Sequence, residues 1–562
     1  MGQKEILARE REEYISSLYK KLNCKVSYKI GDIQEVMLPM QDGIKLRTNI
    51  HFPYDVEKAP VIIVRCCYTD MSRELNIHAQ EYCKRGYIFI VQWCRGIGES
   101  EGIWEPNVNE REDGITTLNW VAEQEFAESI GYWGNSYLAL TGWCIADQVP
   151  EKVKTMYLGV YGTDRHVSAY KDGLFRQDIL TAWAMGNAGT PIQSDYITSC
   201  KYRPQEKVDE ELWGRHLDWY RDWICNESVD SKYWSKGFWK MLKDIPSKVK
   251  IPIYIREGWY DHHLGSALVT YQDLSEESRE HTTLQIGPWN HGYETAVQKQ
   301  DVNGLKDDSV SSPFEWFEKT LKRGIVPEKE ILFYAIGDQK WLKLEKYPVT
   351  PVKYKRMYLD MRQNKNAFSL VYKAGSTDSI CYTYNPDNPV MSHGAESLFY
   401  TKTEVGSLLQ EECGYRDDVI SFVSKVFHEE TEICGKINVR LYVSSNAEDT
   451  AFTAKIMEVF PDKETVNIRG SITTLGYRNS AKSRIQYKPN DIVEINIQMW
   501  DIAWKIQKDS KIRIDISSSD FPQYSVHSNY AENWAKCKKV KKAKQKIYTG
   551  IEYPSVVELP IL

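Results

Sequence analysis

Residues 129–142 read Ser129-Ile-Gly-Tyr-Trp-Gly-Asn-Ser136-Tyr-Leu-Ala-Leu-Thr-Gly142. An apolar, strand-like segment runs into Gly134-Asn135-Ser136, and a helix-like segment rich in small residues follows. A serine on a tight turn from a strand into a helix is typical of a nucleophile elbow, whose strained backbone requires small neighbours. Gly134 meets that requirement, whereas Leu138 stands where the pattern G-x-S-x-G has its last glycine. Taken alone, the segment fits either a nucleophilic serine or a structural serine in a strand-to-helix turn.

Short apolar, β-branched runs on both sides of this segment alternate with helix-like stretches. The candidate strands are residues 61–64, 87–91, 129–133, 155–160, 253–255 and 283–286. Continuous rather than alternating apolar runs are typical of strands that are buried on both faces of a parallel sheet. Residues 109–124 fit an amphipathic helix between two of these strands. We therefore expect an α/β domain with a mostly parallel sheet covered by helices.

Two further zones differ from this α/β pattern. Residues 164–248 have few β-branched runs and six tryptophans, which favours a helical cap inserted over the sheet. An ordinary helical subdomain, with most of those tryptophans in its core, is the alternative. After residue 350 short alternating strands dominate, as in a jelly roll. The predicted division is therefore 1–163 and 249–350 for the α/β domain, 164–248 for the cap and 351–562 for the β domain.

Composition excludes several classes of function. The 562 residues include 72 Lys and Arg against 78 Asp and Glu. The resulting net charge of −6 does not indicate binding to nucleic acid or to an anionic membrane. No apolar run approaches the roughly 18 residues of a membrane span. The N-terminal residues have no signal-peptide core, and the twelve cysteines form no CxxC pair, which indicates reduced thiols in the cytoplasm. We expect a small-molecule substrate as the partner, and a homo-oligomer stays open.

A nucleophilic serine needs a base, and the base needs an acid that orients it. Asp261 ends the strand-like segment 253–261, and His291 follows the strand-like segment 283–286 on a loop rich in Gly and Pro. The order Ser136, Asp261, His291 is that of α/β-hydrolases. Each residue follows a predicted strand, at the sheet edge where open α/β sheets bind ligands.

His262 and His263 follow the acid directly and are candidate metal ligands. We expect the side chains of adjacent residues to diverge, and the chain has no H-E-x-x-H helix. The sequence therefore predicts neither a metal nor a cofactor.

Further motifs are spread over most of the chain. They are Met40-Gln-Asp-Gly-Ile-Lys-Leu46, Arg95-Gly-Ile-Gly-Glu-Ser-Glu-Gly102, Gly258-Trp-Tyr-Asp261, Gly287-Pro-Trp-Asn-His291 and Ser518-Ser-Asp-Phe-Pro522. Together they resemble the X-Pro dipeptidyl-peptidase and cocaine-esterase-like (CocE/NonD) serine hydrolases, a family that includes α-amino-acid ester hydrolases. The resemblance implies an α/β-hydrolase fold with a helical cap and a C-terminal jelly roll.

The resemblance also implies a role for each site residue. Ser136 corresponds to the nucleophile, His291 to the general base and acid, and Asp261 to the residue that orients the histidine. The oxyanion hole of the family corresponds to the hydroxyl of Tyr68 and the backbone N–H of Tyr137, two donors aimed at a developing negative charge. Cys67 replaces the proline that usually precedes the oxyanion tyrosine, but no departure from the family pattern alters Ser136, Asp261 or His291.

The predicted function is a serine hydrolase that cleaves an ester or amide bond of a small acyl or aminoacyl substrate through an acyl-enzyme. An X-Pro dipeptidyl-peptidase and an acyltransferase with an amine acceptor are alternatives, and a catalytically silent binding protein is the alternative from another class. Peptidase members bind a free ammonium with acidic groups. Asp178 and Glu257 are candidates for such groups, but the sequence does not place them in a pocket.

Overall fold

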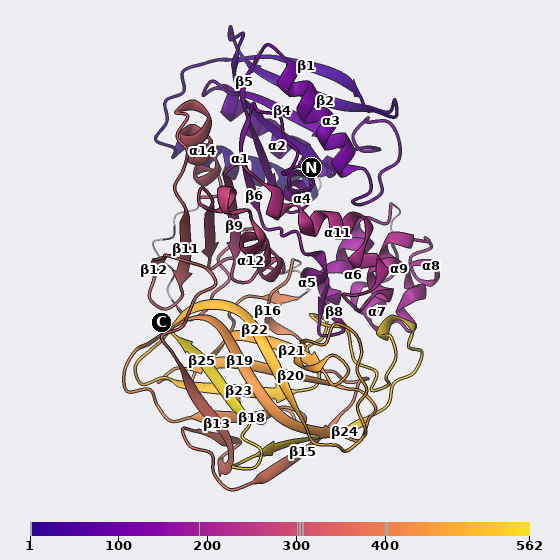
Figure 1. Ribbon diagram of the computed structural model, residues 1–562, viewed down its shortest axis with the longest axis vertical. Coiled ribbons are helices and arrows are strands. Elements are labelled where there is room, and N and C mark those ends of the chain that lie inside the picture. Colours follow the sequence, from indigo (N-terminus) through magenta and orange to yellow (C-terminus); the bar gives the residue numbers. More distant parts are fainter. Residues whose placement is uncertain (1–2, 190–191, 301, 303–304, 306–307, 399–402) are drawn as a thin grey trace.

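The computed structural model describes residues 3–189, 192–300, 302, 305, 308–398 and 403–562. The molecule is elongated, with an α/β half at one end and an all-β half at the other (Figure 1). The helices of the cap, residues 164–248, lie beside the junction of these two halves (Figure 1).

The α/β half is built on a ten-stranded sheet. Its spatial order is β1 (Ile30–Pro39), β2 (Lys45–Pro53), β4 (Ile88–Trp93), β3 (Ala59–Cys66), β5 (Ala127–Asn135), β6 (Val153–Gly159), β9 (Ile253–Gly258), β10 (Thr283–Gly287), β11 (Glu330–Ala335) and β12 (Lys340–Leu344). The pairs from β4 to β11 are parallel, whereas β1, β2 and β12 pair antiparallel with their neighbours. β3 and β4 are buried along their whole length, as their continuous apolar runs predict. The predicted α/β-hydrolase fold class is confirmed.

Helices cover both faces of this sheet. α3 (Glu110–Glu123), α4 (Tyr137–Trp143) and α12 (Leu264–Asp273) pack on one face, with the one-turn helix α13 (Glu276–Arg279) after them. α1 (Gln3–Lys20), α2 (Ser72–Cys83) and α14 (Ser311–Phe317) pack on the other face. The helix expected at 109–124 is confirmed by α3. No helix was predicted for residues 3–20. α1 forms there because Ile15, Leu18 and Tyr19 bury one stripe against the sheet and α2.

The segment between β6 and β9 is mainly helical, as expected. Its elements are α5 (Arg165–Ala169), β7 (Tyr170–Lys171), β8 (Leu174–Phe175), α6 (Gln177–Gly186), α7 (Tyr196–Lys201), α8 (Val208–Glu211), α9 (Asp218–Cys225), α10 (Lys232–Ser235) and α11 (Gly237–Asp244). Four of its six tryptophans, Trp213, Trp223, Trp234 and Trp239, are buried, as core residues are. Trp183 and Trp219 are half-buried.

The C-terminal half is all-β, as predicted. Its strands are β13 (Lys353–Asn364), β14 (Ala367–Val371), β15 (Asp378–Tyr384), β16 (His393–Ala395), β17 (Glu404–Val405), β18 (Ile420–Ser424), β19 (Thr431–Ser445), β20 (Ala451–Val459), β21 (Thr465–Thr474), β22 (Val493–Ile506), β23 (Lys511–Ser517), β24 (Ala543–Thr549) and β25 (Val556–Ile561). Eleven of them form one sheet in the order β15-β24-β19-β25-β13-β14-β18-β23-β20-β21, with β22 paired to β19. β16 and β17 form a separate small sheet.

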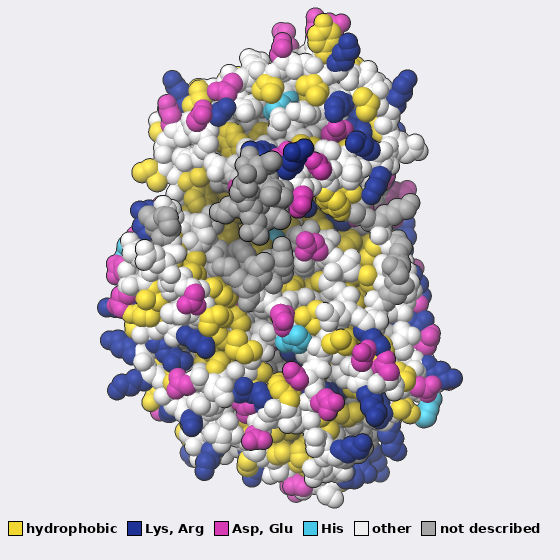
Figure 2. Space-filling view, turned by 180° about the vertical axis from the view of Figure 1, so that it is seen from behind, with side chains coloured by type: hydrophobic (Ala, Val, Ile, Leu, Met, Phe, Trp, Pro, Cys, Tyr) yellow, Lys and Arg dark blue, Asp and Glu magenta, His cyan; other side chains and the backbone are white. Residues whose placement is uncertain are grey.

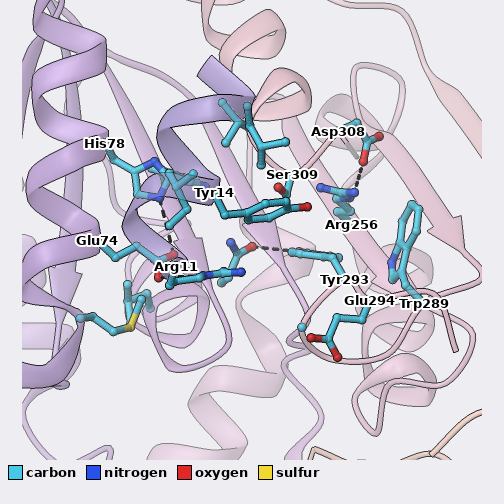
Figure 3. A pocket seen from close by; sticks show the side chains of 18 of the residues that line it. Arg11, Tyr14, Glu74, His78, Arg256, Trp289, Tyr293, Glu294, Asp308 and Ser309 are labelled. Carbon is cyan, nitrogen blue, oxygen red and sulfur yellow. Dashed lines mark hydrogen bonds and ion pairs between the residues drawn. The ribbon is translucent and has the colours of Figure 1, made fainter. Parts of the chain in front are cut away.

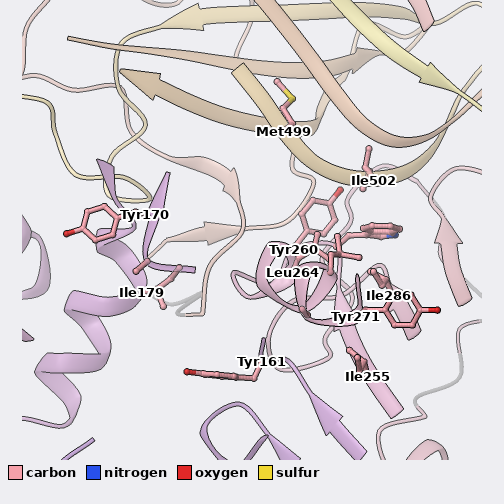
Figure 4. Close-up of a cluster of buried hydrophobic side chains, with 14 of the residues drawn as sticks. Tyr161, Tyr170, Ile179, Ile255, Tyr260, Leu264, Tyr271, Ile286, Met499 and Ile502 are labelled. Atoms are coloured by element: carbon pink, nitrogen blue, oxygen red, sulfur yellow. The ribbon is translucent and has the colours of Figure 1, made fainter. Parts of the chain in front are cut away.

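The apolar core runs without a break from one half into the other (Figure 4). Ile255 and Ile286 of the first sheet, Leu264 of α12, and Met499 and Ile502 of β22 belong to the same buried cluster. Burial of this shared apolar surface fixes the β domain against the loops that follow β9 and β10.

The surface carries charges of both signs. On the face shown in Figure 2, Lys and Arg side chains are interspersed with Asp and Glu. Among the described residues, no helix has both the length and the apolar character that a membrane crossing requires.

Candidate active site

Ser136 occupies a sharp turn between β5 and α4. Its backbone has φ 57° and ψ −127°, a conformation that is costly for a residue with a Cβ. A Cβ at Gly134 would lie 2.1 Å from the carbonyl oxygen of Leu138, so only glycine fits there. Leu138 is itself buried, and its side chain packs into the core beside α2. The larger residue is therefore accommodated where the G-x-S-x-G pattern has glycine.

Asp261 and His291 reach Ser136 from adjacent parallel strands. β9 and β10 pair in register, so the loops after them leave the same edge of the sheet. Nδ1 of His291 lies 2.5 Å from Oδ2 of Asp261, and Nε2 of His291 lies 2.9 Å from Oγ of Ser136. The other carboxylate oxygen of Asp261 accepts the backbone N–H of His263 at 2.6 Å. The three predicted residues thus form one continuous hydrogen-bonded chain that ends at the serine hydroxyl.

Tyr68 and Tyr137 lie beside Ser136, and all three line one cavity. Burial raises the pKa of the Tyr68 hydroxyl well above its usual value, so this hydroxyl keeps its proton. It accepts a hydrogen bond from Nε1 of Trp183 at 3.1 Å, which leaves its own proton to donate. Tyr137 is the first residue of α4, and the first N–H groups of a helix have no partner within it. The Tyr137 hydroxyl points elsewhere and donates to Glu110 at 3.0 Å.

The cavity at Ser136 has a volume of about 30 Å³. Besides the predicted residues, it is lined by cap and loop side chains that include Tyr161, Arg165, Ile179, Leu180, Trp183, Trp223, His262, His263 and Leu398. This volume fits a small substituent of a substrate. None of the described side chains that line it is an Asp or a Glu.

His262 and His263 do not diverge, which corrects the expectation from their adjacency. Their ring centroids lie 4.0 Å apart, and the His262 ring lies 4.9 Å from that of His291. Burial, with the neighbouring histidines and arginines, lowers the pKa of His262 and of His263 well below the usual value, so both rings are neutral. The fold brings them together because both are central residues of the turn in which the N–H of Leu264 donates to the carbonyl oxygen of Asp261.

Asp261, His262 and His291 each offer one atom to a metal ion, and these atoms lie within 4.8 Å of one another. In the structure Nδ1 of His291 and Oδ2 of Asp261 are already engaged with each other, and Oδ1 of Asp261 accepts the backbone N–H of His263. The donor set therefore suits the histidine–carboxylate pair better than a resident metal.

Asp178 and Glu257 are not among the residues that line the Ser136 cavity. Both are fully buried, and each has one carboxylate oxygen without a hydrogen bond. Burial raises the pKa of Asp178 to about 8, and burial together with the charge of Asp261 raises the pKa of Glu257. Neither residue is placed to bind an ammonium group of a substrate in this cavity.

A larger cavity, of about 590 Å³, lies between α1, α2 and the segment after β10 (Figure 3). Its lining includes Asn135 and Gly292, the neighbours of Ser136 and His291, but neither of those two residues themselves. The hydroxyl of Tyr293 donates to Oδ1 of Asn135 at 2.9 Å, and both residues line this cavity. Ser136 and Tyr68 line the smaller cavity instead.

Comparison with known proteins places the chain in a family. Residues 42–293 match the sequence model of the X-Pro dipeptidyl-peptidase (S15 family), and residues 324–558 match that of the X-Pro dipeptidyl-peptidase C-terminal non-catalytic domain. The chain belongs to the X-Pro dipeptidyl-peptidase and cocaine-esterase-like family. It is therefore a serine hydrolase of ester or peptide bonds.

Relatives within and around this family are similar over nearly the whole chain. A cocaine esterase from Rhodococcus sp. (strain MB1 Bresler) is 26% identical over 573 residues, which cover 94% of this chain and 98% of that protein. An aminopeptidase from a marine sediment archaeon, Thaumarchaeota archaeon, has a TM-score of 0.79 at 20% identity, over 96% of this chain and 98% of that one. An α-amino acid ester hydrolase has a TM-score of 0.78 at 19% identity, with the same coverage. The two structures show the likeness of the fold.

Sequence reasoning did not single out Arg165, Trp183 or Trp223, which line the cavity from the cap. The aromatic density of the cap was visible, but nothing in the sequence separates a tryptophan over the serine from one in the cap core.

Proposed function

We propose that the protein hydrolyses a small ester or amide through an acyl-enzyme formed on Ser136. The observation that carries the proposal is the continuous hydrogen-bonded chain from Asp261 through His291 to the Ser136 hydroxyl. In a family of serine hydrolases, this arrangement supports the roles of orienting acid, base and nucleophile.

The proposed reaction begins when His291 takes the proton of Ser136 through Nε2, and the Ser136 oxygen attacks the substrate carbonyl carbon. The tetrahedral oxyanion accepts hydrogen bonds from the Tyr68 hydroxyl and the Tyr137 backbone N–H. The imidazolium of His291, paired with Asp261, then gives its proton to the departing alcohol or amine as the carbon–oxygen or carbon–nitrogen bond breaks. A water molecule, activated by the same histidine, hydrolyses the acyl-enzyme and regenerates Ser136.

The decisive experiment compares the wild type with Ser136→Ala on p-nitrophenyl butyrate. We expect Ser136→Ala to lose all but a residual fraction of kcat, because the nucleophile is gone while the fold remains. Ser129→Ala is the matched control: it makes the same change on β5, where the Ser129 hydroxyl has no hydrogen-bond partner, and should leave activity intact. A fluorophosphonate should label the wild type and Ser129→Ala but not Ser136→Ala. Full activity in Ser136→Ala would refute the assignment.

An X-Pro dipeptidyl-peptidase is the second candidate, favoured by the family match over residues 42–293. Glycyl-prolyl-p-nitroanilide distinguishes it from an esterase. The absence of an Asp or Glu among the described residues that line the cavity supports the esterase or amidase, because a peptidase of this kind must hold a free ammonium. Cleavage of the anilide that depends on Ser136 would reverse this preference.

We also propose three domain boundaries, which lie after residues 163, 248 and 350.

We further propose that the protein works in the cytoplasm. All twelve cysteines are free in the structure, and seven of them sit in the first 200 residues without a bridge, which supports a reducing compartment.

A further inference from the structure

Seven arginines of the described residues are buried, and six of them face a carboxylate. The six ion pairs are Arg65–Glu110, Arg85–Glu81, Arg176–Glu396, Arg256–Asp308, Arg469–Glu396 and Arg513–Asp515. Arg165, which is 8% exposed, is the exception: within the described part of the chain it has no ion pair and no hydrogen bond from its side chain. Its Nε is buried without a partner.

The lack of a counter-charge at Arg165 is costly, because a guanidinium keeps its proton in proteins and a buried charge is stabilised chiefly by an opposite charge. The guanidinium lies over the rings of Trp223, Tyr161 and Trp239, at 5.1 Å, 5.9 Å and 6.0 Å from their centroids. These cation–π contacts compensate only part of the lost hydration. The neighbouring acid, Asp164, is engaged elsewhere: it forms an ion pair with Lys243 at 2.7 Å and caps α5.

Arg165 lines the same cavity as Ser136 and Tyr68. Among the described residues that line this cavity, none is acidic, and His262 and His263 are neutral. The cavity next to the reacting serine therefore holds one full charge, which is positive. An arginine fork matches the two oxygens of a carboxylate.

We propose that Arg165 binds a carboxylate of the substrate, so that the protein acts on short esters or amides that carry an anionic group, such as half-esters of dicarboxylic acids. This inference rests on the proposed function, since it assigns the substrate class of the Ser136 site. The bound carboxylate supplies the counter-charge that the fold omits. Arg165 thereby determines specificity, and the chemistry at Ser136 is unchanged.

The test compares related substrates that differ chiefly in charge. Mono-p-nitrophenyl glutarate carries a carboxylate on the acyl side, p-nitrophenyl valerate is its neutral counterpart, and p-nitrophenyl 4-aminobutyrate carries an ammonium. 4-Butyryloxybenzoate and phenyl butyrate form the matching pair with the charge on the leaving group. The pair whose kcat/KM ratio changes when Arg165 is replaced shows which side of the substrate bears the carboxylate.

In the wild type, we expect kcat/KM to be higher for the anionic than for the neutral member of one pair. The ratio of these two kcat/KM values should fall by about 10- to 100-fold in Arg165→Met. Arg165→Lys should fall in between, because it keeps the charge but loses the fork. Comparing the ratio between enzymes cancels the spontaneous reactivity of each ester. Arg215→Met, which removes an exposed arginine of the cap, is the matched control and should leave the ratio at the wild-type value.

If the ratio of kcat/KM for the anionic to the neutral substrate is equal in the wild type, Arg165→Lys and Arg165→Met, the inference is overturned and the proposed function stands. The same holds if the wild type prefers the ammonium ester. A wild type that hydrolyses none of these esters and is not labelled by a fluorophosphonate would instead refute the proposed function. If Arg165→Met does not fold, competition in the wild type decides. Glutarate should inhibit valerate ester hydrolysis competitively and more strongly than glutaramide, and equal inhibition would overturn the inference.

Discussion

Tyr68 and Tyr137 differ in which of their groups faces Ser136. The Tyr68 hydroxyl keeps its proton because burial raises its pKa, and it accepts a hydrogen bond from Trp183, whereas the Tyr137 hydroxyl already donates to Glu110. If both tyrosines stabilise an oxyanion, one must use its side chain and the other its backbone N–H. We therefore expect the two side chains to contribute differently to catalysis.

Tyr68→Phe should lower kcat by about 10²–10³ with a smaller effect on KM, because an oxyanion donor acts mainly in the transition state. Steady-state kinetics on p-nitrophenyl butyrate measure both constants. Tyr137→Phe is the control, since it removes a hydroxyl of the same kind but keeps the backbone N–H. A Tyr68→Phe variant as active as Tyr137→Phe would exclude the Tyr68 hydroxyl from the oxyanion hole.

At the scale of elements, α6 links the cap to the cavity. Ile179, Leu180 and Trp183 of this helix line the cavity, and Asp178 in its first turn is fully buried. An acid in the first turn is favoured by the helix dipole, but burial of the carboxyl is the larger effect and raises its pKa to about 8. The helix is therefore anchored by a carboxyl that is mostly protonated at neutral pH.

This pKa predicts how stability depends on pH. The folded pKa of Asp178 is above its unfolded value of 3.8, so the folded state binds an extra proton between these values, and stability contributed by Asp178 falls as the pH rises from about 4 to about 8. Asp178→Asn, which is neutral in both states, should lose this dependence. Its thermal midpoint should rise relative to the wild type between pH 5 and pH 8, as measured by circular dichroism on both proteins. A difference in midpoint that stays constant over this range would contradict the assigned pKa.

At the scale of the whole molecule, the β domain supports the loop that carries Asp261. Arg469 of β21 donates through Nη1 to the backbone oxygen of Trp259 at 2.5 Å and to Glu396 at 2.7 Å. Its Nη2 donates to the backbone oxygen of Asp501 at 2.7 Å. One buried side chain of the β domain thus joins β22 to the segment between β9 and the acid.

Arg469→Met should lower the free energy of unfolding by about 3–5 kcal/mol, because it leaves the carboxylate of Glu396 buried with less compensation. The loop with Asp261 also loses a support, so kcat should fall in the protein that remains folded. Urea unfolding and kinetics on p-nitrophenyl butyrate measure the two effects. Arg356→Met breaks the exposed pair with Glu558 and should cost about 0–1 kcal/mol; an equal loss in both variants would remove any special role of Arg469.

The sequence determined the elements whose signal is local. The strands around Ser136, the helix at α3 and the all-β C-terminal half follow from hydrophobic period and turn residues, and the structure confirms them. The requirement for glycine at position 134 can be predicted for the same reason, because the strain of a strand-to-helix turn depends on the residues next to it. The order and motif context of Ser136, Asp261 and His291 pointed to one site because parallel strands end at one edge of a sheet.

Only the tertiary structure decided what surrounds Ser136. Charge compensation is a property of space, so the sequence could not show that Arg165 lacks a carboxylate or that Asp178 and Glu257 lie outside the cavity. Adjacency in sequence likewise did not predict how the His262 and His263 rings lie, since the turn after Asp261 sets their direction. The fold of this protein is encoded in local periodicity, whereas the charge and shape of its cavity arise where the cap and the sheet meet.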